Sequence, residues 1–321
     1  MVLTRPAAYG FLFAGMAVVG SYVALSKPLA ATIPIFLLAM LRFGIAAVAM
    51  IPWTRTAASD EKPSASDWRA LFLQSFFGNF LFSICMLNGV ALTSASAAGI
   101  ILATLPAVVA VFSALFLRER LTGRAIGAIV LAVSGIAVLQ LTRAGDGIGG
   151  EHATLGNLLV FASVCCEATY VIIGKRLTAK LSAMRISALI NLFGFALILP
   201  FGLWQARAFD FGSLGAGSWA LLVYYAIAAS TLSTWLWLTG LKVVPANHAG
   251  VFTVALPLTS TLIAVTLLGE SLTTGHGIAF ACAVGGILLI ATSRDSKAMP
   301  KNVESVGRDQ GKQADYSNPS N

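Results

Sequence analysis

The protein has 321 residues, of which 57% are hydrophobic and only 11% are charged, and its mean hydropathy is +0.84. A soluble domain carries roughly 25% charged residues, so this composition excludes an ordinary soluble enzyme or binding domain. The net charge of +8 follows from Lys and Arg gathering in loops on one side of a membrane, and it does not require a nucleic-acid partner.

Apolar segments of about 20 residues, the length that crosses a bilayer as an α-helix, follow one another along the chain. In chain order they cover residues 8–26, 33–52, 68–89, 95–117, 123–141, 155–173, 184–204, 218–240, 246–268 and 274–292. We therefore expect an all-α membrane protein with ten transmembrane helices. Residues 293–321 are polar and are expected to form a disordered cytoplasmic tail, because they have too few apolar side chains to dock.

The distribution of Lys and Arg predicts the orientation. If the N-terminus is inside, almost all basic residues fall on the cytoplasmic side and only Lys27, Arg143 and Arg207 remain outside. The positive-inside rule therefore predicts a multi-pass protein of the bacterial inner membrane with both termini cytoplasmic and the lipid bilayer as its surroundings.

The chain contains an internal repeat. Residues 68–141 align without a gap with residues 219–292, and a shift of 148 aligns the first predicted helix with the sixth. Matching pairs include Trp68 and Trp219, Gly89 and Gly240, Pro106 and Pro257, Glu119 and Glu270, and Tyr22 and Tyr170. The first helix could also be a cleavable signal peptide, but its full-length counterpart favours a retained helix.

Each repeat holds five predicted helices, an odd number, so the second copy must enter the membrane upside down. Arg118, Arg120 and Arg124 follow the fourth helix, whereas the matching residues 269–276 contain no Lys or Arg. We expect a first repeat at 8–141 and a second, inverted repeat at 155–292.

The two copies share a pattern of Gly, Pro, Glu-x-Leu-Thr and Gly, and the second predicted helix contains Arg42-Phe43. On these features, residues 8–292 resemble the EamA-type members of the drug/metabolite transporter superfamily. The resemblance implies ten helices with both ends cytoplasmic and a central cavity lined mainly by helices 1, 3, 4, 6, 8 and 9. It also implies export of amino acids or other small metabolites. The pattern comprises Gly99, Pro106, Glu119 and Gly135 in the first copy and Gly250, Pro257, Glu270 and Gly286 in the second.

Glu167 is the only acidic residue deep in a predicted helix, one turn from Tyr170. A charged side chain at a helix centre costs about 2.5–3.5 kcal/mol on insertion scales, so Glu167 should face a cavity or a partner. It could accept a proton that couples transport, bind a substrate ammonium group, or make a structural hydrogen bond. Its counterpart in the first repeat is Val19, so such a site would be asymmetric, with Tyr22 as the counterpart of Tyr170.

Further polar residues form matching faces on the third and eighth predicted helices. Asn79 and Ser83 are four residues apart, as are Ser230 and Thr234, and we expect these faces to line a pocket. Trp235 or Trp237 would form an apolar wall of this pocket, with a place at the membrane interface as the alternative for either Trp. Ser and Thr also bond their own helix backbone, which is the structural alternative.

Two further features concern the helix interiors. Pro106 and Pro257 each remove a backbone hydrogen bond and are expected to kink their helices, either as hinges or as static packing features. Arg42 could bind a substrate carboxylate or pair with Glu167. Because the resemblance places its helix away from the centre of the cavity, we expect Arg42 to be structural.

The sequence therefore predicts a secondary transporter, an exporter of small metabolites such as amino acids or amine-containing compounds that works by alternating access. Its partners would be the substrate and, if transport is coupled, protons. An intramembrane enzyme and a passive channel are the alternatives, and an enzyme is disfavoured because no catalytic motif is intact. The four cysteines, spaced unlike zinc ligands, predict neither a disulfide nor a metal site, and no cofactor is implied. Gly123-x-x-x-Gly127 predicts close helix packing, with a homodimer as the alternative.

Overall fold

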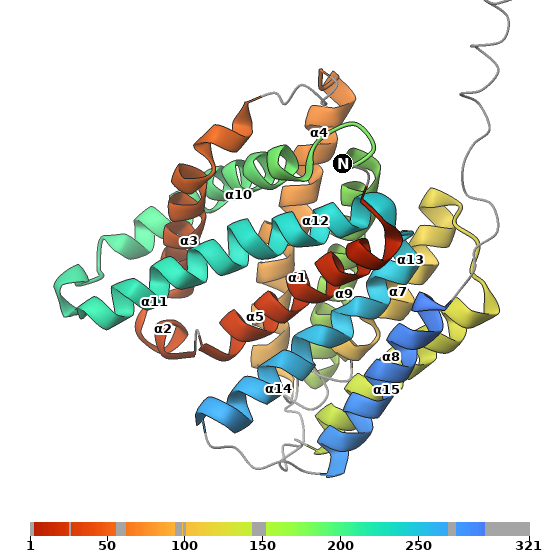
Figure 1. The fold of residues 1–321 in the computed structure, drawn as a ribbon. Helices are drawn as coiled ribbons and strands as arrows, with labels where there is room; N and C mark the ends of the chain where they lie inside the picture. The colour runs from red at the N-terminus through yellow and green to blue at the C-terminus, as the bar shows by residue number, and fades with distance from the viewer. Residues whose placement is uncertain are drawn as a thin grey trace, which may run out of the picture. The chain divides into compact units, whose positions relative to one another are not determined.

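A computed structural model describes residues 3–25, 27–55, 62–93, 98, 101–142, 152–268 and 274–292. Every element among these residues is a helix (Figure 1). Several of the helices are long and apolar enough to cross a membrane, and four shorter helices are also apolar. The expectation of an all-α, multi-pass membrane protein is confirmed.

The first half of the chain forms helices within each of its predicted segments. These are α1 (Arg5–Leu25), α2 (Lys27–Thr32), α3 (Ile35–Ala49), η1 (Ile51–Thr54), α4 (Ala65–Ser75), η2 (Phe76–Leu81), α5 (Phe82–Leu92), α7 (Leu105–Phe112), η3 (Ser113–Leu117) and α8 (Gly123–Thr142). Gly99, which belongs to the repeated pattern, lies outside the described residues.

The second half does the same. Its helices are α9 (Ala153–Leu177), α10 (Ala183–Ala206), η4 (Phe211–Ser213), α11 (Ala216–Ala226), η5 (Ile227–Leu232), α12 (Ser233–Val243), α13 (Ala246–Val251), η6 (Phe252–Val254), α14 (Ala255–Leu268) and α15 (Thr274–Ala291). Glu270 and the predicted tail at 293–321 lie outside the described residues.

Three π-helical stretches, η2, η3 and η5, occur among the described residues, and two of them, η2 and η5, lie at matching places of the repeat. The Phe82 N–H donates to the Phe77 carbonyl and the Ser233 N–H to the Ala228 carbonyl, each five residues back. The stretches η2 and η5 begin at Phe76 and Ile227, which the repeat aligns with each other. Such π-turns interrupt the usual i→i−4 hydrogen-bond pattern and are frequent at functional sites.

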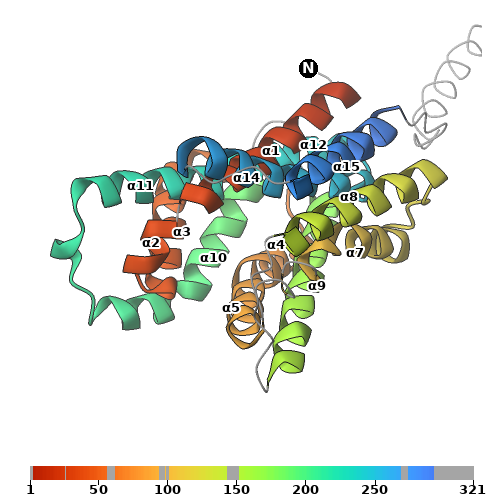
Figure 2. The same ribbon diagram turned by 90° about the horizontal axis from the view of Figure 1, so that it is seen from below.

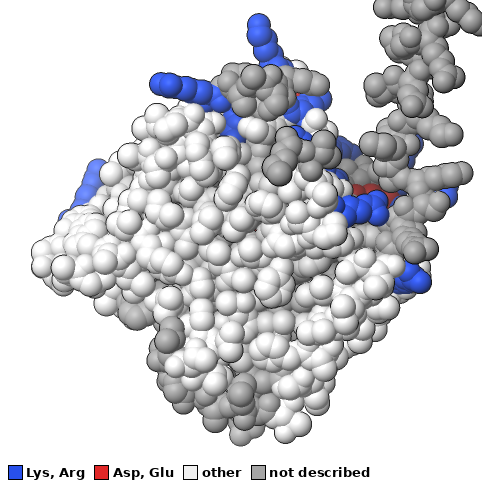
Figure 3. All heavy atoms as spheres, viewed as in Figure 1, with Lys and Arg blue, Asp and Glu red and all other residues white. Residues whose placement is uncertain are grey.

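Neighbouring helices pair across the two halves of the chain. α1 packs against α12 and α14, α5 against α9, α3 against α10, and α8 against α15, as Figures 1 and 2 show. Side chains such as Leu12, Val171 and Leu238 are buried between them, whereas Val48, Leu158 and Leu288 are exposed apolar residues suited to lipid. The face in Figure 3 is broadly uncharged, with Lys and Arg mostly along its upper and right-hand border.

Small residues set two of these crossings. A Cβ atom added at Gly89 in α5 would lie 2.8 Å from the Val160 backbone nitrogen and 3.0 Å from the Gly156 carbonyl oxygen in α9. A Cβ atom added at Gly240 in α12 would lie 2.7 Å from the Ala8 carbonyl oxygen in α1. Only glycine allows the backbones to approach so closely.

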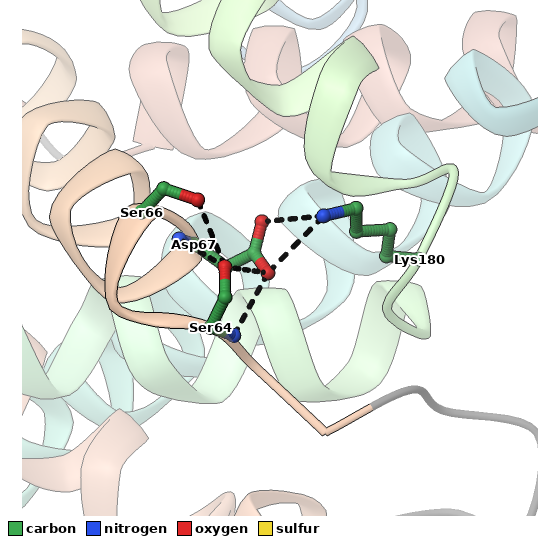
Figure 4. A network of polar contacts seen from close by, with 4 residues as sticks. All are labelled: Ser64, Ser66, Asp67 and Lys180. Carbon is green, nitrogen blue, oxygen red and sulfur yellow. Dashed lines mark hydrogen bonds and ion pairs between the residues drawn. The ribbon is translucent and has the colours of Figure 1, made fainter.

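Polar contacts join the helix ends at one end of the bundle. Ser64 caps α4 by accepting a hydrogen bond from the Asp67 N–H, and the Asp67 carboxylate accepts one from the Ser64 N–H (Figure 4). Lys180, which follows α9, forms an ion pair with Asp67 at 3.3 Å. The start of α4 and the connection after α9 therefore lie together.

The turn between α12 and α13 is held from two sides at the same end. The Lys175 Nζ donates to the carbonyls of Leu241 and Val244, each at 2.7 Å, at the C-terminal end of α12. The Glu119 carboxylate accepts from the N–H groups of Ala246 and Asn247, at 2.9 and 3.1 Å, at the start of α13. A cation at a helix C-terminus and an anion at an N-terminus both match the helix dipole.

Other contacts join the opposite ends of the helices. Thr93 after α5 donates to the Asn157 side chain at 2.6 Å, and Gln205 near the end of α10 accepts from the Leu37 N–H at 3.0 Å. In both cases the contact joins helices from different halves of the chain.

Candidate functional site

Glu167 lies in the middle of α9 and is half-buried. Its carboxyl group interacts electrostatically with the hydroxyl groups of Tyr22 and Tyr170. The one ion pair among the described residues is that of Lys180 with Asp67, so Glu167 and Arg42 are not paired with each other. An acid in this setting is available to a proton or to a cationic group of a ligand.

Tyr170 is fixed by close packing. Its ring lies directly against Gly78 in η2, where a Cβ atom would collide with Cδ2 of the ring. Its carbonyl accepts a hydrogen bond from Gln74 Nε2 at 3.3 Å, and its hydroxyl reaches the Thr234 side chain in α12. Tyr170 therefore connects α9 with η2 and with α12, the helix that follows η5.

Tyr22 near the end of α1 is the counterpart of Tyr170. Its ring meets the ring of Tyr225 edge to face, with centroids 5.4 Å apart. Its hydroxyl interacts electrostatically with both Arg42 and Glu167. Tyr22 thus interacts with both an acid and a base of this region.

Arg42 lies at the middle of α3. Its guanidinium carbon is 4.2 Å from the centroid of the Phe43 ring and 5.6 Å from that of Tyr225. Its Nε is buried and has no hydrogen-bond partner. We name Tyr22, Arg42, Glu167, Tyr170, Tyr225 and Thr234 the Glu167 cluster.

Trp235, the residue after Thr234, lies near two other aromatic rings. Its ring is 6.0 Å from that of Phe11 in α1 and 6.3 Å from that of Trp53 in η1. These rings come from three helical elements, and a role of Trp235 as a wall of a site remains a proposal.

The polar face on α4, η2 and α5 turns toward α10. Asn79 Nδ2 donates to Ser75 Oγ at 3.1 Å and to the Ile190 carbonyl of α10 at 3.4 Å. Ser83 Oγ donates to the Asn79 carbonyl at 2.6 Å, one turn back in its own helix. These bonds match the structural alternative that the sequence left open, and a place in the site remains a proposal for both residues.

Ser230 lies in the π-helical stretch η5 and is buried. Its carbonyl accepts a hydrogen bond from Asn191 Nδ2 at 2.9 Å, while its Oγ has no hydrogen-bond partner. A buried hydroxyl without a partner is costly, so a ligand or water that bonds to it would be stabilised.

Both predicted hinge prolines follow an irregular stretch. Pro106 is the second residue of α7, after a turn at Thr104, and Pro257 is the third residue of α14, after the 3-10 turn η6. Under the shift of 151 the two interruptions fall next to each other, because η6 at 252–254 corresponds to residues 101–103, directly before Thr104. The regular α-helix is thus interrupted just before each proline. That the two prolines act as hinges remains a proposal.

The sequence did not single out Tyr225 or Gln74. The repeat aligns these two residues with each other, and each contacts a tyrosine of the opposite half: Tyr225 meets Tyr22, and Gln74 meets Tyr170. The signal was present in the alignment, as two polar residues at matching places in apolar helices.

The packing motif and the cysteines have ordinary surroundings. Gly127 in α8 faces α15, because a Cβ atom added there would lie 3.6 Å from Leu289 Cδ1. Gly123 has no neighbour within 4 Å of its Cβ position among the described atoms. Cys85, Cys165, Cys166 and Cys282 are free thiols.

Comparison with known proteins gives a consistent picture. The sequence model of the EamA-like transporter family matches residues 6–141 and, a second time, residues 154–292. An uncharacterized transporter of Bacillus subtilis, YetK, is 37% identical over 290 residues, which is 90% of this chain and 88% of the relative. An uncharacterized transporter of Haemophilus influenzae is 34% identical over 143 residues, 44% of this chain and 83% of the relative.

A crystal structure of another protein shares the fold. It aligns with a TM-score of 0.74 over 90% of this chain and 97% of that chain, at 21% sequence identity. At this identity the likeness concerns the fold alone.

Proposed function

The chain belongs to the EamA-like transporter family, and from this premise we propose that it is a secondary transporter that exports small metabolites by alternating access. That it is a membrane transporter follows from the family and from the 37% identical relative. The proposal concerns the mechanism, the direction and the cargo, for which amino acids and amine-containing compounds are the first candidates.

The observation that carries the mechanism is the matched packing of the two halves. Gly89 of α5 approaches the backbone of Gly156 in α9, and its counterpart Gly240 approaches the backbone of Ala8 in α1. The shift of 148 also aligns Ala8 with Gly156. Equivalent crossings in two copies support ten transmembrane helices in two inverted repeats, which can exchange conformations around a central site.

Polar contacts support the proposed topology. The ion pair of Lys180 with Asp67, the Lys175 contacts and the Glu119 contacts join four connections predicted to be cytoplasmic. With the basic residues of these connections, they favour an inner-membrane protein with both termini in the cytoplasm.

We propose that the transport site comprises the Glu167 cluster, with Trp235 as its apolar wall. Glu167 would take up the coupling proton or the ammonium group of the cargo, and Tyr22, Tyr170 and Thr234 would supply hydroxyl groups. Asn79, Ser83 and Ser230 would complete the polar faces, and Pro106 and Pro257 would act as hinges beside the site. Because Tyr170 reaches Thr234 and packs on Gly78, movement of α9 would be passed to the helices that contain η2 and η5.

An intramembrane enzyme and a passive channel remain the alternatives, and reconstitution separates them from a carrier. The purified protein is placed in liposomes loaded with an unlabelled metabolite, and uptake of the same radiolabelled metabolite is followed over time for a panel of amino acids and amines. A carrier gives a transient accumulation that saturates with concentration. Simple equilibration without an overshoot would support a channel, and chemical conversion of a metabolite would support an enzyme.

A further inference from the structure

Arg42 is a base in the apolar interior whose charge is not matched by a neighbouring acid. Within the described part of the chain, no carboxylate lies within 4.0 Å of its guanidinium group. The acids at Asp67, Glu119 and Asp210 are engaged elsewhere, with Lys180, with the start of α13 and with the Gly212 N–H. Arg42 is therefore a strong anion-binding group beside the proposed site, and no described carboxylate forms an ion pair with it.

The surroundings of Arg42 hold its position but do not satisfy it. The rings of Phe43 and Tyr225, 4.2 and 5.6 Å from its Cζ, stabilise the cation through their faces. These ring contacts do not use the five N–H donors of the guanidinium as hydrogen-bond donors to oxygen, so the donors remain for an acceptor. The buried Nε without a partner is one of these donors.

Tyr22 links this unsatisfied base to the proposed transport site. Its hydroxyl interacts electrostatically with both Arg42 and Glu167, and its ring packs on Tyr225, which also contacts Arg42. Arg42 and Glu167 therefore lie in the same region of the protein, with Tyr22 interacting with both.

We propose that Arg42 binds a carboxylate group of the transported molecule, so that the cargo is a small organic acid with one carboxylate. A guanidinium binds a carboxylate through two parallel hydrogen bonds, which suits Arg42 because its described contacts are with aromatic rings and its Nε has no hydrogen-bond partner. Glu167 at the other side of Tyr22 disfavours a second acidic group, which makes monocarboxylates, including those with an amine, better ligands than dicarboxylates. This inference rests on the proposed transport function and names the chemistry of its site.

The test compares carboxylates with their amides on the purified full-length protein. The probes are hexanoate and hexanamide, phenylacetate and phenylacetamide, leucine and leucinamide, with succinate and adipate as dicarboxylates, and binding is read from tryptophan fluorescence. We expect at least one carboxylate to bind roughly 10- to 100-fold more tightly than its amide, the factor typical of a hydrogen bond to a charged group. Neither dicarboxylate should bind as tightly.

Two variants attribute the preference to Arg42. Arg42→Met should reduce the ratio of carboxylate to amide affinity to about one, and Arg42→Lys, which keeps the charge without the planar fork, should leave an intermediate ratio. Arg55→Met removes the same charge from an exposed residue and should keep the wild-type ratio. If Arg42→Met does not fold, the wild-type ratio and that of Arg42→Lys decide.

The proposal is overturned if no probe pair shows a carboxylate preference in the wild type, or if the preference survives unchanged in Arg42→Met or, where that variant does not fold, in Arg42→Lys. Counterflow distinguishes this failure from failure of the transport function. Transport of neutral molecules or amines with no effect of Arg42→Lys would remove the carboxylate site and leave the transporter intact. Absence of counterflow with every metabolite would instead contradict the proposed function.

Discussion

Adding one methyl group at a helix crossing tests the close packing on which the proposed inverted repeat rests. In Gly89→Ala, the new Cβ would lie 2.8 Å from the Val160 backbone nitrogen, whereas ordinary contacts begin at 3.4 Å. The two helices would have to separate by about 0.6 Å, because the atoms in contact belong to the backbone and cannot rotate away. The same holds for Gly240→Ala, where the Ala8 carbonyl oxygen would be 2.7 Å away.

The expected magnitude is the balance of two effects. Overpacking typically costs about 1–3 kcal/mol, whereas replacing glycine by alanine within a helix gains up to about 1 kcal/mol. Both variants should therefore lower the free energy of unfolding by roughly 1–2 kcal/mol. Gly10→Ala in α1 is the matched control, because nothing lies within 4 Å of its Cβ position among the described atoms, and it should be neutral or slightly stabilising.

Equilibrium unfolding in mixed detergent micelles measures these differences. Equal behaviour of all three variants would refute the close crossings. A large effect at Gly89 with none at Gly240, or the reverse, would refute the equivalence of the two halves even if one crossing is close.

Three further predictions concern coupling, topology and the helix ends. Glu167→Gln should exchange substrate at equal pH but lose accumulation driven by a pH gradient if Glu167 carries the proton; exchange should fail too if it binds a substrate ammonium, and wild-type rates in both assays would reduce it to a structural residue. Cysteines at Lys62 and Ser213, both exposed positions, should label oppositely in whole cells, with an impermeant maleimide reacting at residue 213 and not at 62; the reverse pattern would mean inverted topology. Glu119→Ala should lower the free energy of unfolding by about 1–2 kcal/mol, because two N–H groups at the start of α13 lose their acceptor, and an unchanged unfolding curve would contradict the capping contact.

The helical segments could be predicted from the sequence because each is a run of about 20 mostly apolar residues, the length that crosses a bilayer. Hydropathy does not reveal where a helix changes its hydrogen-bond pattern. The π-helical stretches at Phe76–Leu81 and Ile227–Leu232 contain ordinary apolar and small residues, and they follow from packing between helices. Once the two stretches are known, the internal repeat accounts for their matching positions, because it aligns Phe76 with Ile227.

The candidate site could be predicted only in part, for a related reason. Glu167 stands out in any apolar helix, but spacing along a helix does not say which neighbour a side chain meets. Asn79 and Ser83 share a helix face as expected, yet Asn79 bonds to the Ile190 carbonyl of α10 and Ser83 bonds back to its own helix. The contact of the Arg42 guanidinium with the Tyr225 ring joins residues far apart in the chain, and no local pattern predicts it.

Labelling of one residue in the proposed site from both sides of the membrane tests alternating access most directly. Thr234→Cys is placed in a variant whose four native cysteines are replaced by alanine, and an impermeant thiosulfonate is applied to right-side-out and to inside-out vesicles. Alternating access predicts reaction from each side, slowed by transported substrate in both cases. Reaction from one side only, or labelling that substrate does not slow, would contradict a central site that opens in turn to the two compartments.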